Sequence, residues 1–244
     1  QWHDVDLMLL DQPADQEDVR AVGKVMVISP RARFGVISDI DDTVITSFAK
    51  DFLRMARTVI LGDARGRTPF PGVAAFYRAL HAGINPLFYV SSSPWNVYDL
   101  FVDLFELRGI PLGPFFLRDW GIKPREYMPR DHQKYKLKTI RNILDFYPHL
   151  PFILIGDSGQ EDPEIYSQLV TLYPGRIQTV YIRHVGQDKA RGQEVNALAK
   201  QAREMGTPIF LADDTFSMGE HAAAKGWISS QDAAQIGVDL ERRL

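Results

Sequence analysis

Three aspartates stand within four positions of the chain, directly after a short apolar run. They are Asp39, Asp41 and Asp42 in the string GVISDIDDTVITS, residues 35–47. Two carboxylates about 4 Å apart repel each other by roughly 4 kcal/mol at an effective dielectric near 20. A shared proton, a basic side chain or a metal ion must offset that repulsion. The spacing therefore indicates a site that handles protons, a cation, or both.

Asp39 and Asp41 are suited to a division of labour. Alternate residues of an extended segment point to the same side, so the two carboxylates can share one face while Ile40 packs into the core. One carboxylate can then attack a phosphorus atom while its partner transfers protons. The pair predicts phosphoryl transfer through an aspartyl-phosphate intermediate.

Polar residues also follow two other apolar runs. Ser91 and Ser92 end the string PLFYVSS, and Asp157 and Asp162 come during and after PFILIGD. Because ligands of open parallel sheets bind at the carboxyl ends of the strands, we expect these side chains to converge at one edge. Two or three carboxylates suit Mg²⁺, which usually keeps several waters. The sequence therefore predicts a magnesium site beside a phosphate site.

A phosphate group also needs hydrogen-bond donors and positive charge. Ser91 can donate from its hydroxyl, and loop amides after Asp39 can form an anion-binding nest. The string HQKYKLKTIRNIL brings Lys134, Lys136 and Lys138 to the start of a helix, whose N-terminus itself favours an anion. Such a lysine trio is usually a solvated basic face, so its role depends on the other segments.

The elements that must position these residues follow from the apolar pattern. Short apolar strands alternate with helical stretches from Gly35 onward, which predicts an α/β fold with a Rossmann-like parallel sheet and helices on both faces. Ser93-Pro94 and Asp162-Pro163 are each typical of an N-cap followed by proline in the first helical turn. The expected strands cover 35–40, 86–92, 151–157, 178–184 and 207–213, and the expected helices include 72–83, 96–109, 135–148 and 163–175.

Three segments surround or interrupt this pattern. Residues 1–34 hold two strand-like alternations, which predict a β-hairpin or the remnant of an upstream β domain. Residues 44–68 are expected to form a small helical cap insertion in the main domain, 35–214. Its apolar face either packs on the core, which we favour, or forms a lid or lipid-facing lip over an open site. Residues 215–244 are expected to be packing helices.

Composition narrows the class of protein. The chain has 244 residues, 45% of them hydrophobic, and its 28 basic and 31 acidic residues give a formal net charge of −3. This balance argues against a nucleic-acid partner, and no apolar run approaches the roughly 18 residues of a transmembrane helix. The chain lacks cysteine, which excludes zinc–thiolate sites and cysteine nucleophiles. We expect a cytoplasmic protein, or one peripheral to a membrane.

The chain resembles the haloacid dehalogenase superfamily of phosphohydrolases in four motifs that occur in the family's order. These are D-x-D-x-T/V at residues 39–43, a serine after an apolar strand at Ser91, a lysine near a helix start, and G-D followed by another aspartate at Gly156, Asp157 and Asp162. The resemblance implies a fold of that type with a small cap. Each motif is weak alone, and their shared order makes the resemblance specific.

A closer resemblance is to the catalytic domain of the actin-patch phosphatidate phosphatase family, over about residues 25–184. The strings that carry it are GVISDIDDTV, PFPGV, YVSSSPW, HQKYKL, FILIGDSGQEDPEIY and PGRIQTVYIR. It implies Asp39 as nucleophile and Asp41 as acid and base. It also implies phosphate binding by Ser91 and by Lys136, which precedes a leucine as in the family.

The same resemblance implies a Mg²⁺ ion held by Asp157, Asp39 and the carbonyl of Asp41. Asp162 is either a further metal-site residue or only a helix cap, and one side chain can serve both purposes. We therefore expect a Mg²⁺-dependent phosphomonoester hydrolase acting on a membrane phospholipid. The alternatives are a phosphatase for a soluble phosphomonoester, and a non-catalytic module that binds phospholipid or a partner protein.

Overall fold

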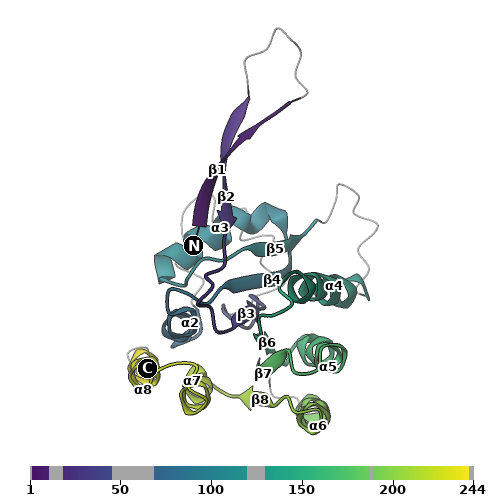
Figure 1. Ribbon diagram of the computed structural model, residues 1–244. Helices are drawn as coiled ribbons and strands as arrows, with labels where there is room; N and C mark the ends of the chain where they lie inside the picture. The colour runs from purple at the N-terminus through teal and green to yellow at the C-terminus, as the bar shows by residue number, and fades with distance from the viewer. Residues whose placement is uncertain (1, 11–18, 46–68, 120–129, 187–188, 242–244) are drawn as a thin grey trace.

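The core of the protein is a six-stranded parallel sheet. A computed structural model describes residues 2–10, 19–45, 69–119, 130–186 and 189–241. The strands of the sheet lie in the order β5-β4-β3-β6-β7-β8, and every paired neighbour is parallel (Figure 1). Their bounds are β3 Gly35–Ser38, β4 Leu87–Pro94, β5 Phe115–Arg118, β6 Phe152–Asp157, β7 Ile177–Arg183 and β8 Ile209–Ala212.

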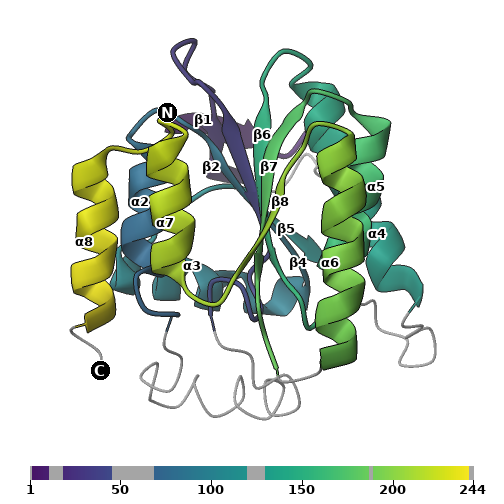
Figure 2. The same cartoon turned by 90° about the horizontal axis from the view of Figure 1, so that it is seen from below.

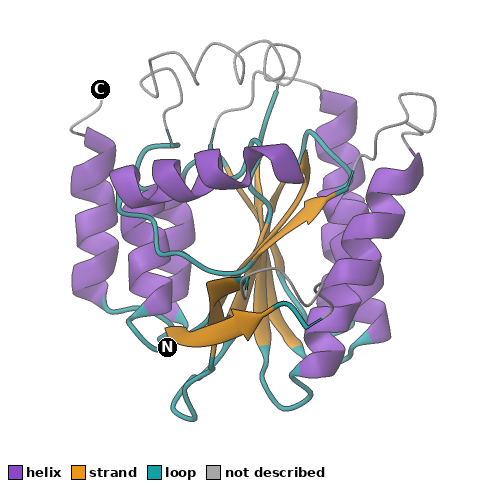
Figure 3. Cartoon of the chain, turned by 90° about the horizontal axis from the view of Figure 1, so that it is seen from above, coloured by secondary structure: helices purple, strands orange, loops and turns teal. Residues whose placement is uncertain are grey.

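Helices cover both faces of this sheet (Figures 2 and 3). One face carries α2 Val73–His81, α3 Tyr98–Arg108, α7 Thr215–Ala224 and α8 Ser230–Glu241. The other carries α4 Arg130–Phe146, α5 Asp162–Leu172 and α6 Lys189–Glu204. The predicted α/β fold, with a parallel sheet and helices on both faces, is confirmed.

The central strands are apolar on both faces because both faces are covered. Successive side chains of a strand point to opposite faces, so Val36 of β3 belongs to one buried cluster and Ile37 to the other. Ile153 and Leu154 of β6 divide in the same way. Continuous apolar runs of this kind are typical of buried parallel strands.

A two-stranded hairpin projects from the body of the protein (Figure 1). It consists of β1 Trp2–Met8 and β2 Arg20–Met26, which pair antiparallel from Trp2 with Met26 to Met8 with Arg20. Most of its side chains are exposed, and they include apolar residues of both strands. The division of the chain at residues 34 and 214 stays a prediction.

Some predicted elements differ from the structure or lie outside its described part. Residues 46–68, most of the predicted cap insertion at 44–68, are outside the described residues, whereas Val44 and Ile45 are buried in the core. β5 and α6 were not among the predicted elements. Within the described ranges, no helix is long and apolar enough to cross a lipid bilayer.

Both predicted helix caps are wrong. Ser93 belongs to β4, which continues to Pro94 before the short 3-10 helix η2, Trp95–Val97, and no side chain caps η2. Asp162 is the first residue of α5, and the residue at the N-cap position is Glu161, whose side chain makes no capping hydrogen bond. Ser93 Oγ instead donates to the Asp41 carboxylate, and the Asp162 carboxylate accepts from Lys136 Nζ and the Asp157 N–H.

Candidate active site

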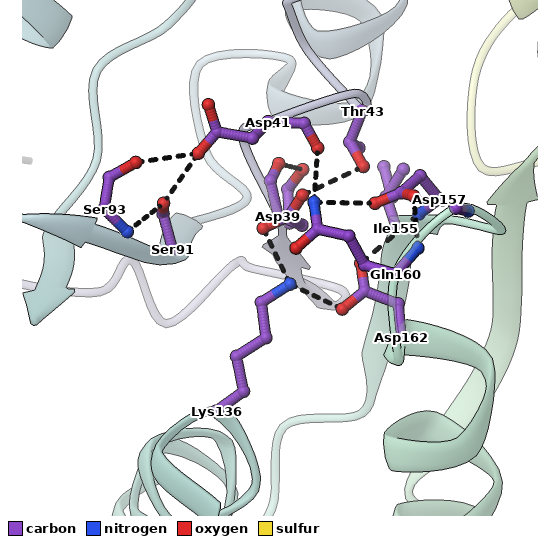
Figure 4. A network of polar contacts seen from close by, with 12 residues as sticks. Asp39, Asp41, Thr43, Ser91, Ser93, Lys136, Ile155, Asp157, Gln160 and Asp162 are labelled. Atoms are coloured by element: carbon purple, nitrogen blue, oxygen red, sulfur yellow. Dashed lines mark hydrogen bonds and ion pairs between the residues drawn. The ribbon is translucent and has the colours of Figure 1, made fainter. Parts of the chain in front are cut away.

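Polar residues that follow β3, that lie in the last part of β4, and that end or follow β6 meet at the carboxyl edge of the sheet (Figure 4). β3 lies between β4 and β6, so the aspartates after β3 face residues from both neighbours. Ser91 comes from β4, Asp157 ends β6, and Asp162 begins α5. The convergence expected from the strand order is therefore present.

Asp39 lies at the centre of the group. It is 1% exposed, and its backbone N–H donates to the carbonyl of Ile155 in β6 at 2.9 Å. The hydroxyl of Thr43 donates to its Oδ2 at 3.2 Å, and Lys136 Nζ lies 2.8 Å from its Oδ1. Each carboxylate oxygen thus has a partner, which fixes the side chain in one orientation.

Lys136 supplies the positive charge. It reaches in from α4, its side chain is 4% exposed, and its Nζ also lies 2.5 Å from Asp162 Oδ1. Lys134 and Lys138 are exposed to solvent on the same helix. Of the three lysines considered from the sequence, the structure brings Lys136 to the site.

Burial and mutual repulsion control the pKa values in this group. Burial raises the pKa of Asp39 well above its ordinary value, Lys136 opposes the shift, and the charges of Asp162, Asp157 and Asp41 add to it. Burial and the charge of Asp162 raise the pKa of Asp157 to about 7, against the opposing effect of Lys136 and backbone N–H groups. The ionised forms of these neighbouring carboxylates therefore disfavour one another, and the contact with Lys136 compensates only part of that effect on Asp39 and Asp157.

The residues present fit a divalent cation. Oxygen atoms of Asp39, Asp157 and Asp162 all lie within 4.8 Å of one another, and all three residues are buried. Oxygen ligands of this kind are what Mg²⁺ prefers, and among the described residues Lys136 is the cation that contacts two of these carboxylates. The Asp41 carboxylate is not part of this group of three, but its backbone carbonyl faces the same region (Figure 4).

The Asp41 carboxylate is held by two serine hydroxyls. Ser91 Oγ donates to Asp41 Oδ2 at 3.1 Å, and Ser93 Oγ donates to the same atom at 2.8 Å. The backbone N–H of Ser93 donates to Ser91 Oγ at 2.9 Å, which joins the two serines. Ser93 was not predicted as a site residue; the i, i+2 spacing of two serines in an extended segment was the signal available.

The loop after β6 adds Gln160, which the sequence reasoning also missed. Its backbone N–H and that of Gly159 donate to Asp157 Oδ1, at 2.9 and 2.7 Å. Its side-chain Nε2 donates to Asp157 Oδ2 and to the carbonyl of Asp41, each at 3.3 Å. Gln160 therefore connects the loop after β6 to the loop after β3.

Arg183, the last residue of β7, holds the loop after β3 through a backbone carbonyl of that loop. The buried guanidinium donates to the carbonyl of Thr43 at 3.2 Å and to Thr215 Oγ1 of α7 at 2.9 Å, and it lies over the ring of Phe70. Burial lowers the pKa of Arg183 to about 10, a value that still leaves it charged at neutral pH. Arg183 ends the string PGRIQTVYIR, but the sequence analysis gave it no role in the site.

Asp42 takes part in the turn of the same loop. Its φ of 59° lies in the left-handed region, which aspartate and asparagine tolerate better than most residues. Its N–H donates to the carbonyl of Ile45 at 2.8 Å. Asp42 therefore shapes the turn of this loop through its backbone.

The fold is that of an α/β domain whose candidate site lies at the carboxyl edge of a parallel sheet. The sequence model "Phosphatidate phosphatase APP1, catalytic domain" matches residues 34–184, and the chain belongs to that family. Phosphatidate phosphatase APP1 of Saccharomyces cerevisiae is 35% identical over 152 residues, which are 61% of this chain and 25% of that protein.

Two further relatives were found. An uncharacterized protein of Schizosaccharomyces pombe is 27% identical over 189 residues, which are 75% of this chain and 30% of that protein. The chain thus spans between a quarter and a third of the length of these two yeast proteins. A solved HAD family hydrolase from Deinococcus radiodurans, with bound phosphate and sodium, aligns with a TM-score of 0.44 at 16% identity, covering 81% of this chain and 99% of that one.

Proposed function

We propose that this domain is a Mg²⁺-dependent phosphomonoester hydrolase that works through an aspartyl-phosphate on Asp39. The observation that carries the proposal is the buried contact between Lys136 Nζ and Asp39 Oδ1 at 2.8 Å, beside two further carboxylates. A carboxylate fixed next to a buried cation is arranged to attack an electrophile that brings its own negative charge. Membership of the phosphatidate phosphatase family supports the same reaction.

Each residue has a defined task in this proposal. An oxygen of Asp39 attacks phosphorus, and the bond from phosphorus to the ester oxygen breaks. Asp41 donates a proton to the departing alkoxide and then accepts one from the water that attacks the aspartyl-phosphate. Lys136 and the hydroxyl of Ser91 stabilise charge on the phosphoryl oxygens.

The metal ion would be held by Asp39, Asp157, the carbonyl of Asp41 and Asp162. Bound there, Mg²⁺ supplies Lewis-acid stabilisation of negative charge on the phosphoryl group. In this proposal the carboxylates of Asp157 and Asp162 have no task in proton transfer. They bind the ion, and Asp162 in addition keeps Lys136 in place through the 2.5 Å contact.

We further propose that the ester is a lipid phosphate. The relative that is 35% identical is named a phosphatidate phosphatase. Trp95 lies two residues after Ser93, and Tyr98 follows shortly after it. Their side chains are 48% and 40% exposed, and their ring centroids are 5.7 Å apart. Exposed aromatic rings beside a site suit an apolar group or the interface of a bilayer.

The experiment that tests the proposal measures phosphate release from phosphatidate in mixed micelles and from a panel of soluble monoesters, each with Mg²⁺ and with EDTA. Metal-dependent release that prefers the lipid supports both parts. Release from soluble esters alone supports the proposed reaction and contradicts the proposal that the substrate is a lipid phosphate. If no phosphate is released in any well although vesicles are bound, the non-catalytic binding module is the better description.

Asp39→Asn and Asp42→Asn form a matched pair for the same assay. Both substitutions remove one negative charge from the same loop, and asparagine tolerates the backbone of Asp42. We expect Asp39→Asn to abolish turnover while the domain stays folded, and Asp42→Asn to keep most of it. Substantial activity of the Asp39→Asn variant would exclude the aspartyl-phosphate.

A further inference from the structure

A single arginine of α6 holds the loop that follows β6. Arg191 Nε donates to the carbonyl of Ser158 at 2.8 Å, and one of its terminal nitrogens donates to the carbonyl of Gln160 at 2.6 Å. The same nitrogen donates to Glu164 Oε2 at 2.9 Å, and the other contacts Glu164 Oε1. The guanidinium therefore holds two loop carbonyls and the first turn of α5 together.

These contacts are stronger than an ordinary surface ion pair. The Arg191 side chain is 22% exposed and that of Glu164 is 32% exposed, and two-point pairing of a guanidinium with a carboxylate fixes direction as well as distance. Burial alone would raise the pKa of Glu164, but the hydrogen bonds from Arg191 lower it instead. The pair thus stays charged throughout the neutral range.

The loop that Arg191 holds carries the contacts of the metal site. The amides of Gly159 and Gln160 orient Asp157 Oδ1, and the side chain of Gln160 joins Asp157 Oδ2 to the carbonyl of Asp41. Arg191 binds the carbonyl of Gln160 and so fixes the position of that residue. The backbone N–H and the side-chain amide of Gln160 in turn donate to Asp157 and to the Asp41 carbonyl. A continuous series of hydrogen bonds therefore runs from α6 through Gln160 to Asp157 and Asp41.

We propose that Arg191 is a positioning residue for the metal site and acts through Gln160 and the loop 157–162. The inference rests on the proposed function, since it assumes that Asp157 and the Asp41 carbonyl bind a cation. The hydrogen bonds of Arg191 described above are with Ser158, Gln160 and Glu164, so its effect on these groups passes through the loop. It also lies outside residues 34–184, the segment that matches the family, so the family match does not point to it.

The simplest competing explanation is that Arg191 only ties α6 to α5. That tie would contribute to the free energy of unfolding and leave the affinity for metal unchanged. Partners that orient metal ligands from outside typically change metal affinity by about 10- to 100-fold when they are removed. Affinity for metal and thermal stability measured without metal therefore separate the two explanations.

The test compares four purified proteins: the wild type, Arg191→Ala, Arg191→Lys and the control Arg203→Ala. Arg203 is an exposed arginine of the same helix. Binding of Mn²⁺ alone is measured by electron paramagnetic resonance, and the melting temperature is measured in EDTA. We expect Arg191→Ala to weaken Mn²⁺ binding by about tenfold or more, Arg191→Lys to be intermediate because lysine lacks the planar fork, and Arg203→Ala to match the wild type.

The outcomes are distinguishable. Wild-type Mn²⁺ affinity in both Arg191 variants, with a lower melting temperature, would overturn the inference and leave the proposed function standing. If Arg191→Ala does not fold, the affinity of Arg191→Lys decides by itself. A wild-type protein that binds no Mn²⁺ would overturn both the metal-dependent function and this inference. If the wild type binds Mn²⁺ but has no phosphatase activity, the proposed reaction is wrong. The Mn²⁺ affinities of the Arg191 variants then still decide whether Arg191 positions the metal site.

Discussion

Ser93 Oγ donates a hydrogen bond of 2.8 Å to Asp41 Oδ2, the carboxylate oxygen that Ser91 also contacts at 3.1 Å. In the proposed reaction Ser91 binds the phosphoryl group, so it cannot serve Asp41 alone. Ser93 is then the residue that keeps the acid and base carboxylate directed at the site. The two tasks are divided between two serines of one strand.

Replacing Ser93 tests this division. Ser93→Ala removes a hydrogen bond to a charged acceptor, worth about 1.5–3 kcal/mol, so we expect kcat to fall by about tenfold or more with little change in KM. Ser93→Thr keeps the hydroxyl and should retain much of the activity. Ser92→Ala is the control, because the two hydroxyls that donate to Asp41 Oδ2 are those of its neighbours Ser91 and Ser93. Steady-state kinetics measures the effect, and equal kcat values for Ser93→Ala and Ser92→Ala would contradict the role proposed for Ser93.

The position directly before Asp157, Gly156, has no room for a side chain. A Cβ at this position would lie 2.4 Å from Asp162 Oδ2 and 2.8 Å from both Asp162 Cβ and Tyr166 Cε2. The Tyr166 ring cannot move away easily, because its hydroxyl donates to the carbonyl of Ile155 at 3.0 Å. The absence of a side chain at Gly156 therefore lets Asp162 approach Lys136.

We expect Gly156→Ala to lower stability by about 1–3 kcal/mol, as overpacking does, and to lower kcat strongly by displacing Asp162. The matched control is Gly192→Ala in α6, where an added Cβ meets nothing within 4 Å. Alanine should stabilise that helix by about 0.5–1 kcal/mol. Urea unfolding and kinetics on both variants check the contrast, and equal effects at the two positions would contradict it.

The sequence predicted the central sheet well because its signals are local. β3, β4, β6 and β7 are buried on both faces, so each is a continuous apolar run that can be recognised without its neighbours. β5 has four residues after a segment rich in proline and glycine, and α6 is a polar helix with Gly192 in its interior. Neither shows a clear periodicity, and both form through contacts with elements distant in the chain.

The site shows the same limit. Asp39, Asp41, Ser91, Asp157 and Asp162 follow apolar strands, so the topology of a parallel sheet is enough to bring them together. Ser93 was assigned to a helix cap because Ser-Pro commonly begins a helix, and only the tertiary structure shows that β4 continues to Pro94. Gln160 and Arg183 meet partners 119 and 140 residues away, which no local pattern can indicate.

Lys136 provides a sharp test of the charge balance. Lys136→Met keeps most of the side-chain volume and removes the buried positive charge between Asp39 and Asp162. Breaking a buried ion pair by removing one partner typically costs about 3–5 kcal/mol, so we expect a clear loss of stability in EDTA and loss of turnover. Lys134→Met, on the exposed side of α4, should change neither. Denaturant unfolding that does not distinguish the two variants would exclude Lys136 as the buried counter-charge.

The raised pKa of Asp157 predicts how stability depends on pH without metal. Its pKa is about 7 in the folded protein and about 3.9 in an unfolded chain. Between these values the folded state binds more protons than the unfolded state, so the free energy of unfolding falls as pH rises from about 4 to 7. Above pH 7 this contribution no longer changes.

Urea unfolding in EDTA at pH 5, 6, 7 and 8 measures this dependence, with Asp157→Asn as the comparison that isolates the carboxyl. The wild type should lose stability relative to Asp157→Asn as pH rises to about 7, because only the wild type acquires a buried charge there. Mg²⁺ and the proton compete for the same carboxylate, so added Mg²⁺ should reverse the loss at pH 8 more than at pH 5. The contrary outcome is a wild-type protein that gains stability relative to Asp157→Asn as pH rises across this range in EDTA. It would show that protein groups alone compensate the charge of the Asp157 carboxylate. The argument from uncompensated negative charge to a bound cation would then fail.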